Sequence, residues 1–585
     1  MKSSHAARFP SQEYCEREPG AHAGLFASSR VPLLVLIGVW MVVIPIVNPI
    51  GEFMVNDDWA FIRSLENLVF NGTMGSTGWG PAGAPGGPSL ITHLSWGRLF
   101  THLFGHSITT LRVSVIVIGI LGSLALLVLL RSSGASPWTS LWGVLTLVFC
   151  PLFLPLCFSF MTDATFASLA VASVLLLNRG VCKKNHALIV FGLLIALGSI
   201  LTRQIGIVLP LGFVLACWIH PQGRALGRGK ILVFSASLVV MPWLLYECVL
   251  FFIGSTPITD HQVVQSVMVR YNSEGLIGFV QLIGHRLLFI VLYFGFFVSP
   301  VVAVRYREFL RFRSFRYFCV AWATCLALVQ AALILGLIDP PIFLWRNTVT
   351  DFGVGPVLLK DTYVLGIARG LTVPKTLYYL LAGWGVLSAA GCLILMVSSF
   401  TRIVRVPATE DSAVIGFLTV FSLLTGLLYL GIILVTGFHD RYLLPLIMLG
   451  IVWIISDAPR THDVPCNPVR YAPCLVPLTA IALFTVLSLH DFTELKRAQS
   501  LALDYLMKDK KVDPCHVDGG FEFNGYHCYR EPFQPRPGLS WWWVDKEDFI
   551  VTLGPLPGYR VVETFPFKRY IGGDAAIHVL EPSTR

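Results

Sequence analysis

Long apolar blocks alternate with short polar connections along the chain of 585 residues. The blocks are apolar all round rather than on one face, a pattern typical of helices that lie within a bilayer. A helix needs about 20 apolar residues to cross the bilayer. The pattern therefore predicts about thirteen membrane spans, at about residues 31–50, 109–130, 138–156, 164–178, 187–202, 206–219, 231–253, 286–304, 317–338, 376–398, 412–436, 442–456 and 473–490.

The composition agrees with a membrane protein. Hydrophobic residues make up 55% of the chain and charged residues 13%, whereas soluble domains contain roughly 25% charged residues. The net charge of +9 would fit a nucleic-acid partner, but the basic residues lie in short clusters between the apolar blocks. Such clusters set the orientation of membrane proteins. We therefore expect an all-α polytopic membrane protein with no nucleic-acid partner.

The basic clusters also predict a topology. They lie at residues 179–184, 224–230, 305–316 and 402–405, all on the side of the N-terminus if every predicted span is real. The positive-inside rule makes that side cytoplasmic. We expect a disordered cytoplasmic segment over residues 1–30, a membrane domain over 31–490 that begins with an uncleaved anchor, and an exported domain over 491–585.

Two polar regions on the predicted exported side have a structure of their own. The first exported loop, residues 51–108, holds amphipathic segments at 59–70 and 91–105, separated by the Gly/Pro-rich stretch "GWGPAGAPGGPSL". We expect interfacial helices there, with Trp59 and Phe61 at headgroup depth. The tail contains the strand-like runs "DFIVTLG", "YRVVETF" and "AAIHVLEP". It predicts a small α/β domain.

Thirteen cysteines are scattered along the chain without metal-binding spacing. Cys515 and Cys528 are the only two in the tail, and two glycine turns separate them. Because an exported tail lies in an oxidising compartment, we predict that they form a disulfide.

Three acids lie at predicted membrane boundaries on the exported side: Asp57 and Asp58 after the first span, and Asp163 in the turn "CFSFMTDATF". Capping of a helix is the alternative role for each, because aspartate favours helix N-termini. Cations and polar groups face the same side. A boundary arginine needs a partner, either a carboxylate or an anionic ligand. The candidates are Arg203 with Gln204, Arg441 with Tyr442, and Lys360.

The order of these motifs resembles the GT-C glycosyltransferases that use lipid-linked sugars, above all the protein O-mannosyltransferases and the lipid A aminoarabinose transferases. The shared features are the acidic pair after the first span, the Gly/Pro loop before a helix ending in "LFG", the "MTDA" turn, and a late "RYLLP". The resemblance covers residues 31–220 and the local "RYLLPL". The relatives often carry His or Lys before the proline that precedes the second interfacial helix, where this chain has Gly86–Gly87–Pro88. That role would pass to His93 or Lys360.

The resemblance implies transfer of a sugar from a polyprenyl-phosphate donor to a glycan, lipid or protein acceptor on the exported face of a bacterial inner or plasma membrane. The leaving phosphate is already anionic, so the reaction needs a base but no general acid. Asp57 would be the base, and the reaction would invert the anomeric centre. Arg203 and Arg441 would hold the phosphate. Asp58 and Asp163 would orient the acceptor or neutralise a cation.

Two other functions remain open. A transporter or flippase would be expected to carry charges near mid-bilayer, and often internal repeats. This chain has no detectable repeat and concentrates its polar residues on one face. An O-antigen-type ligase or polymerase would use the same kind of donor. A divalent metal near the acids is also open, although no His/Asp spacing supports one.

Overall fold

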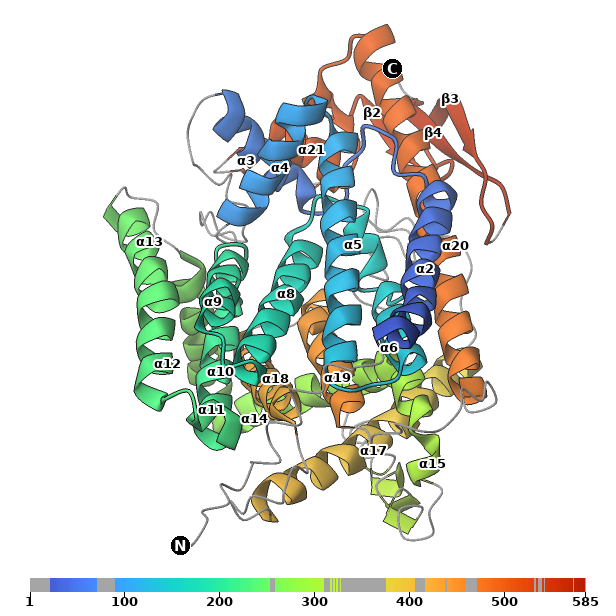
Figure 1. Cartoon of the computed structure of the whole chain (residues 1–585). Helices are drawn as coiled ribbons and strands as arrows, with labels where there is room; N and C mark the ends of the chain where they lie inside the picture. The colour runs from blue at the N-terminus through green and yellow to red at the C-terminus, as the bar shows by residue number, and fades with distance from the viewer. Residues whose placement is uncertain are drawn as a thin grey trace, which may run out of the picture.

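The protein is a helical bundle with a small sheet domain at one end (Figure 1). The computed structural model describes residues 22–70, 90–252, 258–309, single positions between 316 and 327, and residues 375–405, 416–436, 439–457 and 471–583 apart from a few positions in the tail. The bundle contains α2 (His22–Val47), α5 (Ile108–Ser132), α6 (Pro137–Val148), α7 (Leu154–Cys157), α8 (Thr162–Cys182), α9 (His186–Ile200), α10 (Val208–Ile219), α11 (Pro221–Arg224), α12 (Arg228–Ser235), α13 (Met241–Phe252), α14 (Ile258–Val304), α15 (Tyr306–Phe309), α17 (Lys375–Arg405), α18 (Phe417–Thr436), α19 (Leu444–Ser456) and α20 (Ala472–Asp504).

Eight helices among the described residues are long and apolar enough to cross a membrane. Two shorter apolar helices, His186–Ile200 and Gln204–Ile219, coincide with further predicted spans. The predicted span at 138–156 is instead divided into α6 and α7. Pro151 lies between them, and a proline disfavours helical geometry in the residue before it. Most of the predicted span at 317–338 lies outside the described residues. The full number of spans therefore stays a prediction.

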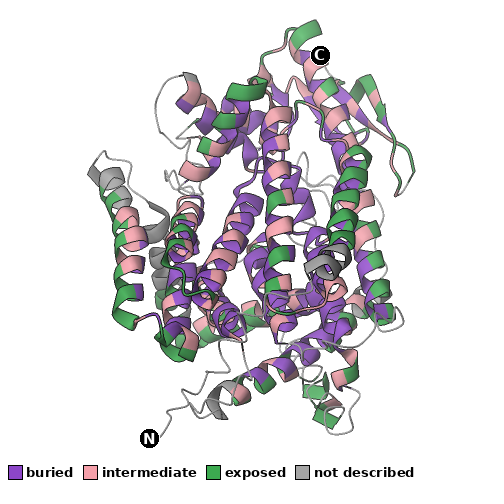
Figure 2. Cartoon of the chain, viewed as in Figure 1, coloured by how far each residue is buried: buried purple, intermediate pink, exposed green. Residues whose placement is uncertain are grey.

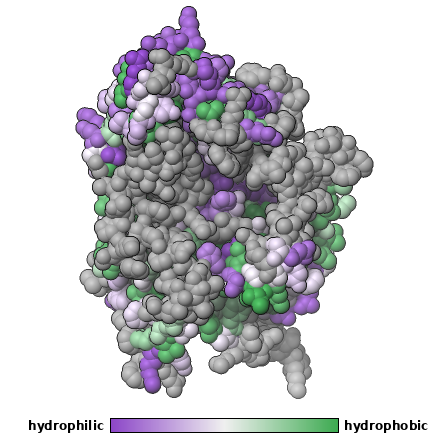
Figure 3. Space-filling model, turned by 180° about the vertical axis from the view of Figure 1, so that it is seen from behind, coloured by the Kyte–Doolittle hydropathy of each residue, from purple (hydrophilic) through white to green (hydrophobic). Residues whose placement is uncertain are grey.

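The two ends of the bundle differ in character. The first loop, with α3 (Asp58–Phe70) and α4 (Ile91–Phe104), lies at the same end as the sheet, whereas α11 and α15 lie at the opposite end (Figure 1). Hydrophilic residues gather over the end that carries the sheet (Figure 3). Arg224 and Arg307 of the basic clusters belong to α11 and α15. The arrangement agrees with the predicted separation of the two sides, while their assignment to cytoplasm and exterior stays a prediction.

Trp59 and Phe61 of α3 face protein, whereas we expected them to face lipid headgroups; the depth of α3 relative to the membrane stays a prediction. Trp59 has 0% of its surface exposed and Phe61 has 9%. The inner parts of the helical bundle are mostly buried (Figure 2). The ring of Trp59 packs against Phe521, Tyr529 and Trp543, with centroids 5.9, 5.4 and 5.6 Å away. Trp59 and Ala60 thus pack against the tail of the protein. Phe61, Ile62 and Leu65 of the same helix pack in the core of the bundle.

The tail folds into a small domain on α20. Its four-stranded sheet has the order β1-β2-β4-β3, with β1 (Val517–Asp518) parallel to β2 (Phe549–Thr552) and antiparallel pairing of β4 (Ala575–Pro582) with β2 and with β3 (Tyr559–Phe567). The three predicted strands are confirmed. A short helix, α21 (Phe521–Cys528), packs on α3. The helix α20 runs without a break across residue 491, where we placed the domain boundary.

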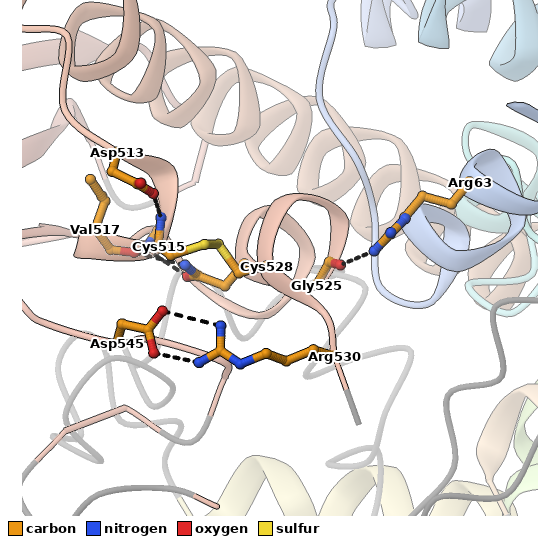
Figure 4. The surroundings of a disulfide bond; sticks show 10 residues. Arg63, Asp513, Cys515, Val517, Gly525, Cys528, Arg530 and Asp545 are labelled. Carbon is orange, nitrogen blue, oxygen red and sulfur yellow. Dashed lines mark hydrogen bonds and ion pairs between the residues drawn. A yellow bond between two sulfur atoms is a disulfide. The ribbon is translucent and has the colours of Figure 1, made fainter. Parts of the chain in front are cut away.

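Cys515 and Cys528 form a disulfide, with their Cα atoms 5.6 Å apart (Figure 4). Replacing both with serine should lower the free energy of unfolding by about 3 kcal/mol, because the bond restricts the unfolded chain. Denaturant unfolding of the purified protein in detergent measures this change. The matched control is Cys248→Ser, which removes an exposed free cysteine. Equal stability of the double variant and the unaltered protein would contradict the prediction.

Candidate functional site

Two acid–arginine pairs lie near the end of the bundle that carries the first loop. Arg441 Nη2 donates to Asp57 Oδ2 at 2.8 Å, and Arg203 donates to Asp163. Asp57 precedes α3, and Asp163 is in the first turn of α8. Arg203 precedes the short helix η1 (Gln204–Ile207), and Arg441 lies in η4 (Asp440–Leu443). The fold thus brings together four of the residues that the sequence singled out.

Tyr442 joins the two pairs into one site. The guanidinium carbon of Arg203 lies 4.9 Å from the centroid of the Tyr442 ring, and that of Arg441 lies 5.7 Å from it. Tyr429 of α18 holds this segment by donating its hydroxyl to the Tyr442 carbonyl at 2.8 Å. Both cations therefore lie beside the same aromatic ring.

The charged side chains of the site are largely buried but keep some exposure to solvent. Exposed fractions are 17% for Asp57, 10% for Arg441, 18% for Arg203 and 4% for Asp163. Asp163 Oδ2 is buried and accepts no hydrogen bond from any described residue. The two acids and two arginines have a formal charge that sums to zero. An incoming anion would therefore compete with the carboxylates for the guanidinium groups.

The backbone before α3 fixes the position of Asp57. Asn56 has a φ of 53°, in the left-handed region that asparagine tolerates better than most residues. Its Oδ1 accepts a hydrogen bond from the Asp57 amide at 2.7 Å. Arg112 of α5 donates to the carbonyls of Gly51 and Phe53 at 3.0 and 2.6 Å. A buried arginine thereby anchors the loop that leads to Asp57.

Asp58 is not part of this site, although the sequence offered it as a catalytic candidate. Its side chain is fully buried, and its two oxygens accept from the amides of Val55 at 2.7 Å and Phe160 at 3.2 Å. Burial raises the pKa of Asp58 to about 7. Asp58 instead ties the first loop to the turn before α8.

His93 does not supply the extra cation that we expected. His93 is fully buried, with Nδ1 at 3.0 Å from Thr165 Oγ1 and Nε2 at 3.2 Å from the Phe160 carbonyl. Burial lowers the pKa of His93 to about 4, so it is neutral near pH 7. It joins α4 to α8. Lys360 lies outside the described residues. Gln204 is the first residue of η1, directly after Arg203.

Two further residues lie in this region: Tyr429, which the sequence pattern does not single out, and His439, which the sequence places beside Arg441 as a boundary residue. Tyr429 lies within an apolar block, where a tyrosine has no distinguishing pattern. The ring of His439 lies 5.2 Å from that of Tyr442. Burial, with Arg441 nearby, lowers the pKa of His439 to about 4. Among the described residues, no group of three or more His, Cys, Asp or Glu side chains could hold a metal ion.

An apolar cavity of about 450 Å³ lies between α4, α5 and α8. Its walls include Trp96, Leu99 and Leu121, and polar atoms form only a small part of its surface. Asp163 lies in the first turn of the same helix, α8, that forms one wall. The molecule therefore combines a compact charged site with an apolar space beside candidate membrane spans.

Comparisons with known proteins give a partial match. The family of dolichyl-phosphate-mannose-protein mannosyltransferases matches residues 94–246, less than half of the chain. Asp163 and Arg203 lie inside this region, and Asp57 and Arg441 lie outside it. No curated protein sequence matches.

Two solved structures of ArnT from Cupriavidus metallidurans are similar at low identity. The apo structure is 13% identical with a TM-score of 0.36, covering 82% of this chain and 80% of that one. The structure bound to undecaprenyl phosphate is 14% identical with a TM-score of 0.35, covering 93% and 97%. The family match over residues 94–246 confirms, for that part of the chain, the predicted resemblance to the GT-C superfamily of glycosyltransferases.

Proposed function

We propose that this protein is an integral-membrane glycosyltransferase that moves a sugar from a polyprenyl-phosphate donor to an acceptor on the exported face, with inversion at the anomeric carbon. The observation that carries the proposal is the pairing of Asp57 with Arg441 beside the pair of Asp163 and Arg203. Together the two pairs supply a carboxylate that can act as a base and two guanidinium groups that can bind a phosphate. The acceptor is a glycan, a lipid or a protein.

Asp57 acts as the base in this proposal. The acceptor hydroxyl or amine attacks the anomeric carbon, its bond to that carbon forms as the bond to phosphate oxygen breaks, and Asp57 takes the acceptor proton. The departing polyprenyl phosphate is a stable anion, so no acid has to protonate it. A single displacement of this kind inverts the anomeric centre.

Arg203 and Arg441 bind the donor phosphate and stabilise the charge that grows on it during bond cleavage. Guanidinium groups suit this task because their planar array of donors matches phosphate oxygens. Donor phosphate would take over the contact that Arg441 now makes with Asp57 at 2.8 Å. This exchange would free Asp57 to meet the acceptor when the donor is in place.

Two neighbouring features support the same assignment. Asp163 keeps Arg203 in position, and its buried Oδ2, which accepts no hydrogen bond from the described residues, is available to orient the acceptor. The apolar cavity between α4, α5 and α8 would receive part of the isoprenoid chain. An apolar lining suits such a chain because its burial is favourable.

A transfer assay tests the proposed function. The purified protein in lipid nanodiscs is incubated with defined polyprenyl-phosphate sugars and with membrane extracts from cells that lack it. We expect release of polyprenyl phosphate together with a glycosylated acceptor of inverted anomeric configuration. Movement of the donor across liposomes without its consumption would instead show a flippase, and retention of configuration would exclude a single displacement.

A further inference from the structure

The C-terminal domain contacts the backbone immediately before Asp57. Glu522 Oε1 in α21 accepts a hydrogen bond from the Asn56 amide at 3.0 Å. The same oxygen accepts from Lys496 Nζ of α20 at 2.9 Å. Both side chains are largely buried, with exposed fractions of 14% for Glu522 and 10% for Lys496. Glu522 thus accepts a hydrogen bond from the backbone amide of Asn56, whose φ lies in the left-handed region. Asn56 directly precedes Asp57, the proposed base.

The C-terminal domain also holds the residues that follow Asp57. A Cβ atom at Gly525 would lie 2.5 Å from the indole of Trp59, so α21 approaches α3 as closely as only glycine permits. Arg63 Nη1 donates to the Gly525 carbonyl at 3.3 Å (Figure 4). The Tyr526 hydroxyl donates to Glu66 at 2.8 Å. These contacts fix the first two turns of α3 against α21.

The C-terminal domain thus holds the backbone on both sides of Asp57, at Asn56 and along α3. The Asp57 side chain itself faces Arg441 rather than the C-terminal domain. From these contacts we infer that Glu522 is a positioning residue for Asp57, and that docking of α21 on the first loop completes the site. The inference rests on the proposed role of Asp57. A base must lie within hydrogen-bond reach of the acceptor, and small displacements of a reacting group cost much of its effect.

The positioning role predicts a specific kinetic change. Glu522→Ala removes the acceptor of the Asn56 amide and should lower kcat at least tenfold, while KM for the donor stays within about twofold, because the arginines are untouched. Glu522→Gln keeps an oxygen for this amide and should retain most of the turnover. The matched control is Glu563→Ala, an exposed residue of β3 in the same domain.

A second measurement separates positioning from a general loss of structure. In the Asp57→Asn background, Glu522→Ala should lower the residual turnover by less than twofold, because a residue that acts through Asp57 has nothing left to position. A full tenfold loss in that background, or unchanged kcat in the single variant, would overturn the inference. Turnover of the unaltered protein tests the proposed function separately. If the unaltered protein transfers no sugar, the proposed function fails, and with it the role of Asp57 on which this inference rests.

Discussion

Asp57→Asn should lower turnover by at least about 100-fold, because a positioned base contributes roughly 10²–10⁴-fold to such a reaction. The amide has the shape of the carboxylate but cannot take the acceptor proton. Binding of the donor should persist, because Arg203 and Arg441 remain. Single-turnover transfer and equilibrium binding of polyprenyl phosphate, measured on the same preparation, separate the two effects.

The control for this substitution is Asp504→Asn, which changes an exposed acid of α20 that forms an ion pair with the exposed Lys508. It should leave transfer unaltered. Turnover of Asp57→Asn within a few-fold of the unaltered protein would reduce Asp57 to a residue that fixes Arg441. Asp163 would then be the remaining acid of the site.

Arg441→Ala should be the second most damaging change, with a loss of about 100-fold or more in transfer. Removing one group that stabilises developing negative charge typically has an effect of this size. The substitution also leaves the partly buried Asp57 without the partner seen at 2.8 Å. Arg441→Lys should recover only part of the loss, because an ammonium group does not reproduce the planar fork of donors.

Steady-state transfer and polyprenyl-phosphate binding check the Arg441 prediction, with Arg560→Ala as the control. Arg560 is an exposed residue of β3 that pairs with Glu581 in the sheet domain. If Arg441→Ala keeps its affinity for polyprenyl phosphate and its turnover, the phosphate is not held by Arg441. If Arg441→Lys matches the unaltered protein, a point charge is sufficient.

Much of the site could be predicted because charge is scarce in this chain. Asp57, Asp163, Arg203 and Arg441 lie at the ends of apolar blocks, where an unpaired charge is costly. This cost indicates that each has a partner. It does not identify the partner, because Asp57 and Arg441 are 384 residues apart and nothing local links them.

The errors have a different physical origin. The apolar face of α3 has the same sequence pattern whether lipid or protein covers it, and here Trp59 packs on the C-terminal domain. The sequence offered His93 as a replacement for the cation that the relatives carry. Its contacts with Thr165 and Phe160 instead make it a buried residue between α4 and α8. Both distinctions depend on tertiary packing, which hydropathy does not describe.

The hydrogen bond from Asn56 to Glu522 joins residues 466 positions apart. This separation has a consequence for biosynthesis. A ribosome that adds about 5–20 residues per second needs roughly 20 to 90 s to travel from one to the other. During that interval the first loop already exists, but the helix that holds it has not been made. If Asp57 is the base and Glu522 positions it, as proposed, a nascent chain would gain transfer activity only after its tail has been made.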